Sequence, residues 1–190
     1  AKGSDWYYMD SNGTPKGEGW LLYDKNWYYL RQDGKMMHSE WLWYDNNWYY
    51  LQSWGGMYKS QWVTIKGATY YFRSWGGIYK NGWQEVDGKT YYFRSWGGMY
   101  RSTFFKAPTG SALYYADENG KMAVGKKQID GDWYYFKDWG GMYQNAFIKN
   151  GTSVCHAAAD GKLTVGWLQQ GSTYYYFDET GEQYFDRFFE

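Results

Sequence analysis

The chain has 190 residues, and its 20 Lys and Arg residues balance its 20 Asp and Glu residues. This zero net charge, with no basic stripe, argues against a protein that binds along nucleic acid phosphates. Trp, Tyr and Phe make up 25% of the sequence while Leu, Ile and Val contribute only 17 residues together, which excludes a core of the usual aliphatic kind and leaves stacked rings to form one.

An aromatic triplet, or a degenerate copy of it, recurs nine times and indicates a repeat protein. A glycine stands seven residues after every start, and a tyrosine stands two residues after every start except at His156. In chain order the units start at Trp6, Trp27, Trp48, Thr69, Thr90, Leu113, Trp133, Val154 and Tyr174. We therefore expect one repeat module over residues 1–190, with 20–23 residues in each unit.

Each unit has the pattern of a β-hairpin. In the second unit, Trp27–Leu30 is rich in strand-forming residues, the turn signal Asp33-Gly34 follows, and the apolar residues Met36 and Met37 begin a return segment. No window shows helical periodicity. A single hairpin is marginally stable in water, whereas hairpins stacked in series share one core. The sequence therefore predicts an all-β solenoid of about nine stacked hairpin repeats.

Four units carry a Trp-Gly-Gly turn in place of a polar one. A tryptophan in a glycine turn is difficult to bury within its own hairpin, so it either packs on the neighbouring unit or belongs to an exposed ladder. Sugar rings stack on flat indole faces, so a ladder would be a platform for an α-glucan or another polysaccharide. The ladder residues are Trp54, Trp75, Trp96 and Trp139.

Two ends of the chain carry the same family pattern. Gly19-Trp20 followed by Trp27–Leu30 resembles the cell-wall-binding repeats of Gram-positive surface proteins and phage lysins, best known as choline-binding repeats. Gly166-Trp167 followed by Tyr174–Phe177 does the same, and the resemblance runs from about Trp6 to Phe188. Related repeats occur in the glucan-binding domains of bacterial glucansucrases and in clostridial toxins. The resemblance implies a left-handed β-solenoid with ligand sites between hairpins.

In that family, choline lies in a cage of about three rings, often with a methionine. By similarity, the first cage combines Trp20, Trp27 and Trp48 with Met36, and the next combines Trp41, Trp48 and Tyr71 with Met57. Further ligand-binding positions implied by the resemblance are Trp62, Trp83, Tyr92, Trp167 and Tyr174. Such a cage suits a quaternary ammonium, because ring faces attract a cation that cannot donate a hydrogen bond.

Several units depart from the cage pattern. The units that start at Thr69, Thr90, Leu113 and Val154 have lost the first ring. Lys126 stands where a tryptophan belongs and would repel a cation, so we expect no cage near Trp133.

Nothing in the sequence indicates catalysis, a metal or a cofactor. Cys155 and His156 are adjacent, so on a strand they point to opposite faces, and the pair replaces two tyrosines of its unit. A single cysteine cannot form a disulfide framework, and two histidines 118 positions apart do not make a metal site. No apolar run approaches the roughly 18 residues of a membrane span.

We therefore expect a non-catalytic binding module that attaches a bacterial surface or secreted protein to the cell wall. Its expected partner is choline or phosphocholine on teichoic acid. An α-glucan is the alternative ligand, and a host protein bound by an adhesin is a third possibility. The expected location is extracellular, and the sequence leaves open whether the chain forms a homodimer.

Overall fold

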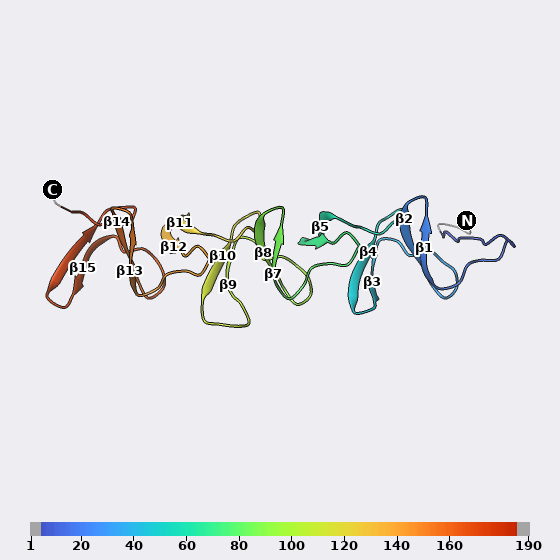
Figure 1. Cartoon of the computed structure of the whole chain (residues 1–190), viewed down its shortest axis with the longest axis horizontal. Helices are drawn as coiled ribbons and strands as arrows, with labels where there is room; N and C mark the ends of the chain where they lie inside the picture. Colours follow the sequence, from blue (N-terminus) through green and yellow to red (C-terminus); the bar gives the residue numbers. More distant parts are fainter. Residues whose placement is uncertain (1–4, 186–190) are drawn as a thin grey trace. The chain divides into compact units, whose positions relative to one another are not determined.

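The computed structural model describes residues 5–185, in which every regular element is a β-strand (Figure 1). Sixteen strands pair into eight separate two-stranded sheets, each made of two strands that follow one another in the sequence. The all-β hairpin solenoid is therefore confirmed. The described part of the chain has no helix that could cross a membrane.

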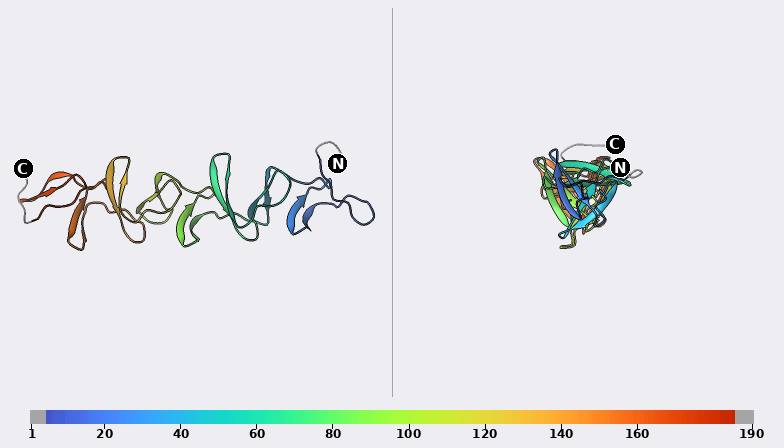
Figure 2. Two further views of the ribbon diagram at one scale, coloured as in Figure 1. Left: turned by 90° about the horizontal axis from the view of Figure 1, so that it is seen from above. Right: turned by 90° about the vertical axis from the view of Figure 1, so that its right-hand side faces the viewer.

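The strands belong to two compact units. The first takes the chain up to Asn81 together with Phe93–Met99, and the second takes Gly82–Tyr92 and the chain from Tyr100 onward. The first unit holds the hairpins β1–β2 (Gly19–Tyr23, Asn26–Leu30), β3–β4 (Glu40–Tyr44, Asn47–Leu51) and β5–β6 (Gln61–Ile65, Ala68–Phe72). The remaining hairpins are β7–β8 (Gly82–Val86, Lys89–Phe93), β9–β10 (Thr103–Lys106, Leu113–Ala116), β11–β12 (Gly125–Ile129, Asp132–Phe136), β13–β14 (Ala146–Asn150, Ser153–Ala157) and β15–β16 (Gly166–Gln170, Thr173–Phe177). Figure 2 shows the same hairpins from two further sides.

The turn that closes each hairpin differs from the expected one. β1 and β2 are joined by Asp24 and Lys25, whose φ angles of 44° and 62° are both left-handed, as a type I′ turn requires. The Asp33-Gly34 turn comes after the hairpin, where the Gly34 amide donates to the Arg31 carbonyl at 2.8 Å. It brings Met36 back beside Leu30 as a single bridge and not as a second strand. The polar dipeptide at 24–25 is the sequence signal for the hairpin turn, and it was missed because it lacks a glycine.

The structure contains eight complete hairpins, one fewer than the nine repeat starts. The segment at Trp6 has no first strand among the described residues, and Tyr7 makes an isolated bridge with Lys35 instead. The end of the expected module, including Phe188, lies outside the described residues.

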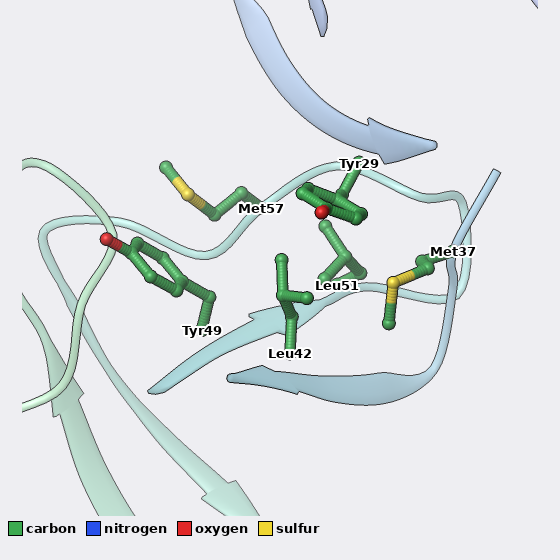
Figure 3. Close-up of a cluster of buried hydrophobic side chains, with 6 residues drawn as sticks. All are labelled: Tyr29, Met37, Leu42, Tyr49, Leu51 and Met57. Carbon is green, nitrogen blue, oxygen red and sulfur yellow. The ribbon is translucent and has the colours of Figure 1, made fainter. Parts of the chain in front are cut away.

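A column of fully buried side chains runs through each unit, at the position three residues after every repeat start except the first, where Met9 is exposed. In the first unit Leu30, Leu51 and Phe72 are between 0% and 1% exposed, and in the second unit Phe136 and Phe177 are in the same range. Around Leu51 lie Tyr29, Met37, Leu42, Tyr49 and Met57 (Figure 3). Rings and thioethers therefore surround a thin column of aliphatic and phenyl side chains.

Successive repeats are joined by one main-chain hydrogen bond each. The Met57 amide donates to the Trp27 carbonyl at 2.8 Å, and the Ile78 amide donates to the Trp48 carbonyl at 3.1 Å. In the second unit the Leu163 amide does the same to Trp133 at 2.7 Å. This bond fixes the residue nine positions after each start against the first residue of the preceding repeat.

Candidate ligand-binding site

Alternation along each hairpin places two tryptophans on one face. Trp20 on β1 lies opposite Tyr29 on β2, and Trp27 is two residues from Tyr29, so Trp20 and Trp27 are diagonal neighbours on the same face. Their ring centroids are 6.4 Å apart and their planes are nearly perpendicular, at 89°. The two indoles therefore form a corner.

The next two repeats complete the walls of a pocket of about 320 Å³, which we call the Trp20 site. Tyr49 of β4 lies 5.0 Å from Trp20 between ring centroids, and Trp75 lies 5.8 Å from Tyr49. The full lining is Trp20, Trp27, Tyr49, Met57, Lys59, Ser74 and Trp75. Three consecutive hairpins, with the segments that follow them, thus contribute to one site.

The same geometry recurs one repeat later as the Trp41 site, a pocket of about 260 Å³. Trp41 lies 6.3 Å from Trp48 and 4.9 Å from Tyr70, and Tyr70 lies 5.9 Å from Trp96. These four rings line the pocket. Burial raises the pKa of both Tyr49 and Tyr70, so neither phenol ionises near neutral pH.

Neither site combines its rings as the resemblance implied. The structure places Tyr49, not Trp48, beside Trp20, because neighbours on β4 point to opposite faces and Trp48 contacts Trp41, its diagonal neighbour on the same hairpin. Tyr71 likewise packs on Trp62 across its own hairpin, at 4.9 Å, and Tyr70 takes the place expected for it.

The methionines shift by one repeat in the same way. Met57 lines the Trp20 site, for which Met36 was expected, because its amide is bound to the Trp27 carbonyl. Met36 lines a different pocket with Trp6, Tyr28 and Trp54.

Two of the Trp-Gly-Gly tryptophans, Trp75 and Trp96, are half-exposed walls of these pockets. Trp75 and Trp96 each lie edge-on to a site tyrosine, at interplanar angles of 68° and 67°. A methyl group on Gly77 would overlap the Trp75 ring, so the second glycine of the turn allows the indole to fold over it. The residues expected to form a separate ladder therefore share the pockets of the cage residues.

A third pocket of about 410 Å³ lies at the N-terminal end of the first unit. Trp6, Tyr28, Met36 and Trp54 occupy the places that Trp27, Tyr49, Met57 and Trp75 take in the Trp20 site. No first-strand tryptophan precedes Trp6 in the described chain, and Tyr7, Tyr8 and Tyr23 contribute instead. Tyr28 was not among the expected site residues, although its equivalence to Tyr49 follows from the repeat register.

In the second unit, one incomplete group keeps most of the rings. Trp83 lies 4.8 Å from Tyr114, and Tyr114 lies 6.0 Å from Trp139, while Thr90 stands where a first ring belongs. Tyr92 packs on Trp83 across its hairpin at 4.7 Å and adds no further wall.

The other expected positions are more scattered. In the first unit Trp62 stacks on Phe93 at 6.0 Å with an interplanar angle of 14°. On the last described hairpin, Trp167 and Tyr174 are 65% and 61% exposed, and Trp167 contacts Tyr176 at 5.2 Å.

Lys126 stands where other repeats have a tryptophan, and its ammonium group is a cation supplied by the protein itself. Its Nζ lies 5.1 Å from the Trp133 ring centroid and donates hydrogen bonds to Glu182 Oε1 at 2.9 Å and to Thr180 Oγ1 at 3.2 Å. The ammonium group is thus held on the ring face that an external cation would use.

Cys155 and His156 form no nucleophile and base pair. Burial raises the pKa of the Cys155 thiol and lowers the pKa of His156. The His156 Nδ1 is 2.8 Å from Thr164 Oγ1, and the ring packs on Phe147 at 4.9 Å, as a replaced tyrosine would. Among the described residues no group of three or more His, Cys, Asp or Glu side chains is arranged to hold a metal ion.

The two complete sites can enclose a compact cation. Their ring walls supply negative quadrupole density, and they offer few hydrogen-bonding groups, so they favour a ligand that needs none. Their volumes lie near or below the lower end of the roughly 300–1,000 Å³ range of drug-sized pockets. A small head group therefore fits them best.

Comparisons with known proteins agree with this geometry. A family model described as cell wall binding repeat matches residues 2–14, 18–36, 39–57, 60–78, 127–142 and 165–182. A second, described as choline-binding repeat, matches residues 80–126. No curated protein sequence matches the chain.

Three solved structures from Streptococcus pneumoniae are similar to this chain. CbpJ is 28% identical with a TM-score of 0.81, covering 95% of this chain and 70% of CbpJ. The choline-binding domain of CbpL is 30% identical with a TM-score of 0.66, covering 98% and 96%. Choline binding protein F, solved in the presence of a peptidoglycan analogue, is 29% identical with a TM-score of 0.73, covering 86% and 56%.

Proposed function

Because the chain belongs to the family of cell wall binding repeats, of the choline-binding type, we propose that it is a non-catalytic module that binds choline on teichoic acid. In this role it holds a bacterial surface or secreted protein on a Gram-positive cell wall.

The observation that carries the proposal is the pair of ring-lined pockets in the first unit. Trp20, Trp27 and Tyr49 form mutually tilted walls, and the same arrangement is repeated at Trp41, Trp48 and Tyr70. A trimethylammonium group presents no donor or acceptor, so it loses no hydrogen bond when such walls enclose it.

The affinity of one site is expected to be low. At roughly 0.5–2 kcal/mol for each ring, three walls give about 2–5 kcal/mol, which corresponds to millimolar binding. A polymer that repeats choline engages several sites together and raises avidity by roughly 10²–10⁴. Repetition of the site thus compensates for its weakness.

Isothermal calorimetry with choline and with its neutral isostere 3,3-dimethyl-1-butanol tests the proposal. Choline is expected to bind, and the isostere, which has the same shape without the charge, is expected to bind much more weakly. Trp27→Ala is expected to remove one choline site, and Lys127→Ala, at an exposed position of the second unit, is its control. Equal binding of the two ligands would contradict a cation site.

An α-glucan ligand remains the second candidate because the Trp-Gly-Gly indoles are accessible. Trp54, Trp75 and Trp96 are 44–48% exposed. Since Trp75 and Trp96 line the proposed choline sites, competition separates the two ligands. Heat on titration with a linear α-glucan but not with choline would favour the glucan, and retention on a choline resin with elution by free choline would favour the first proposal.

A further inference from the structure

We propose that the Trp20 site distinguishes phosphocholine from choline, with Lys59 as the residue that recognises the phosphate. The inference rests on the proposed function, because it assumes that the aromatic walls hold the choline head group. It assigns to one site a preference that the neighbouring Trp41 site lacks.

The position of Lys59 carries the inference. Lys59 is the one charged residue that lines the Trp20 pocket, together with Ser74 and the ring walls. It is exposed, and in the described chain no carboxylate or carbonyl pairs with its ammonium group. The amide of Met57 is bound to the preceding repeat, and Met57 and Lys59, two residues apart, line the same pocket.

The Trp41 site provides an internal comparison. Lys80 is the residue that corresponds to Lys59 one repeat later, but its Nζ lies 4.7 Å from the Trp43 ring and donates to the Asn46 carbonyl at 3.0 Å. Only aromatic residues line the Trp41 pocket. Two sites with similar ring walls therefore differ by one available cation.

Ligand chemistry explains why a cation at the rim of the pocket is selective. An ammonium group repels the trimethylammonium of free choline, so Lys59 makes no favourable interaction with that ligand. Phosphocholine adds an anionic phosphate two carbons away from the cation, where the exposed lysine is able to reach it. The trimethylammonium end of phosphocholine thus suits the ring walls, and its phosphate end suits the ammonium group of Lys59.

A titration of the full chain, followed by nuclear magnetic resonance, resolves the two sites. The indole N–H signals of Trp27 and Trp48, assigned through Trp27→Phe and Trp48→Phe, report the Trp20 and Trp41 sites separately. Choline and phosphocholine are titrated into the wild type, into Lys59→Met, which keeps an apolar stem, and into the matched control Lys80→Met.

In the wild type, phosphocholine is expected to bind the Trp20 site about two- to fivefold more tightly than choline, as one exposed ion pair allows, and the Trp41 site with no preference. Lys59→Met is expected to abolish this preference while choline binding is kept or slightly improved. Lys80→Met is expected to leave the preference intact.

Three results would overturn the inference. If the Trp27 signal follows choline but shows no phosphocholine preference, or if Lys59→Met weakens both ligands equally, Lys59 has no role in phosphate recognition and the proposed function stands. If neither ligand moves either indole signal, the proposed function fails and the inference fails with it.

Discussion

Single substitutions in the repeat change the ring walls of individual copies. Thr90 leaves a gap where Trp27 and Trp48 supply a wall, although Trp83, Tyr114 and Trp139 keep their positions. Lys126 fills its position with an internal ammonium group. The backbone tolerates both changes because the buried column, three residues after each start, is unaffected.

Lys126→Ala is expected to destabilise the second unit by about 0.5–2 kcal/mol, because it removes a cation–π contact and a partly buried ion pair with Glu182. Urea unfolding measures the change. Lys127→Ala, at the exposed neighbouring position, is expected to have little effect. Equal losses in the two variants would show that the Trp133 and Glu182 contacts add no stability.

His156 is expected to make folding sensitive to mild acid. Burial lowers its pKa in the folded state below the unfolded value of about 6.5, so the unfolded chain takes up the proton more readily. The stability it contributes is present above that value and is lost as pH falls through the folded pKa. In urea unfolding at about pH 7.5 and pH 5.5, His156→Tyr is expected to lose less stability on acidification than the wild type. The idea fails if the two chains lose the same amount.

The hairpin and the turn that follows it have separate tasks. Left-handed Asp24 and Lys25 close the hairpin, and the turn that ends in Trp-Gly-Gly or in a polar sequence returns the chain to the preceding repeat. In the Trp-Gly-Gly turns, the first glycine has a left-handed backbone conformation, as at Gly76 with φ of 96°. The second glycine leaves space for the indole of the same turn, as Gly77 does for Trp75, which lines the Trp20 site.

Gly77→Ala is expected to weaken choline binding at the Trp20 site, although Gly77 does not line it, because the added methyl displaces the Trp75 ring. Loss of one wall corresponds to about 0.5–2 kcal/mol of binding free energy. Titration followed at the Trp27 indole signal measures this, and the Trp48 signal serves as an internal reference. Gly17→Ala, where a methyl meets nothing within 4 Å, is the control. Unchanged affinity in Gly77→Ala would remove Trp75 from the cage.

At the scale of the molecule, the repeat register predicted the fold and only part of the sites. Eight of the nine starts lie in the second strand of a described hairpin, because tyrosine, tryptophan and phenylalanine favour strands and recur every 20–23 residues. The pairing of Trp20 with Tyr49 and Trp75 could not be predicted from one repeat. It depends on which face each strand turns toward the preceding hairpin and on a loop that comes from two repeats further along the chain.

Choline is expected to stabilise the folded chain in proportion to the number of occupied sites. A ligand that binds only the folded state at ten times its dissociation constant adds about 1.4 kcal/mol for each site. The rise in urea midpoint with choline should therefore shrink in Trp27→Ala and shrink further when Trp48→Ala is added. A rise that is the same in all three chains would place choline elsewhere.

The contribution of three successive hairpins to the Trp20 and Trp41 sites has a consequence for how such genes change. When a block of 21 residues is duplicated or deleted in register, each newly adjacent pair of copies meets through the same corner, phenol and overlying indole. The change adds or removes one pocket and leaves no broken junction. In-register recombination alone is therefore expected to change the number of pockets, while point substitutions such as those at Thr90 and Lys126 change the lining of individual copies.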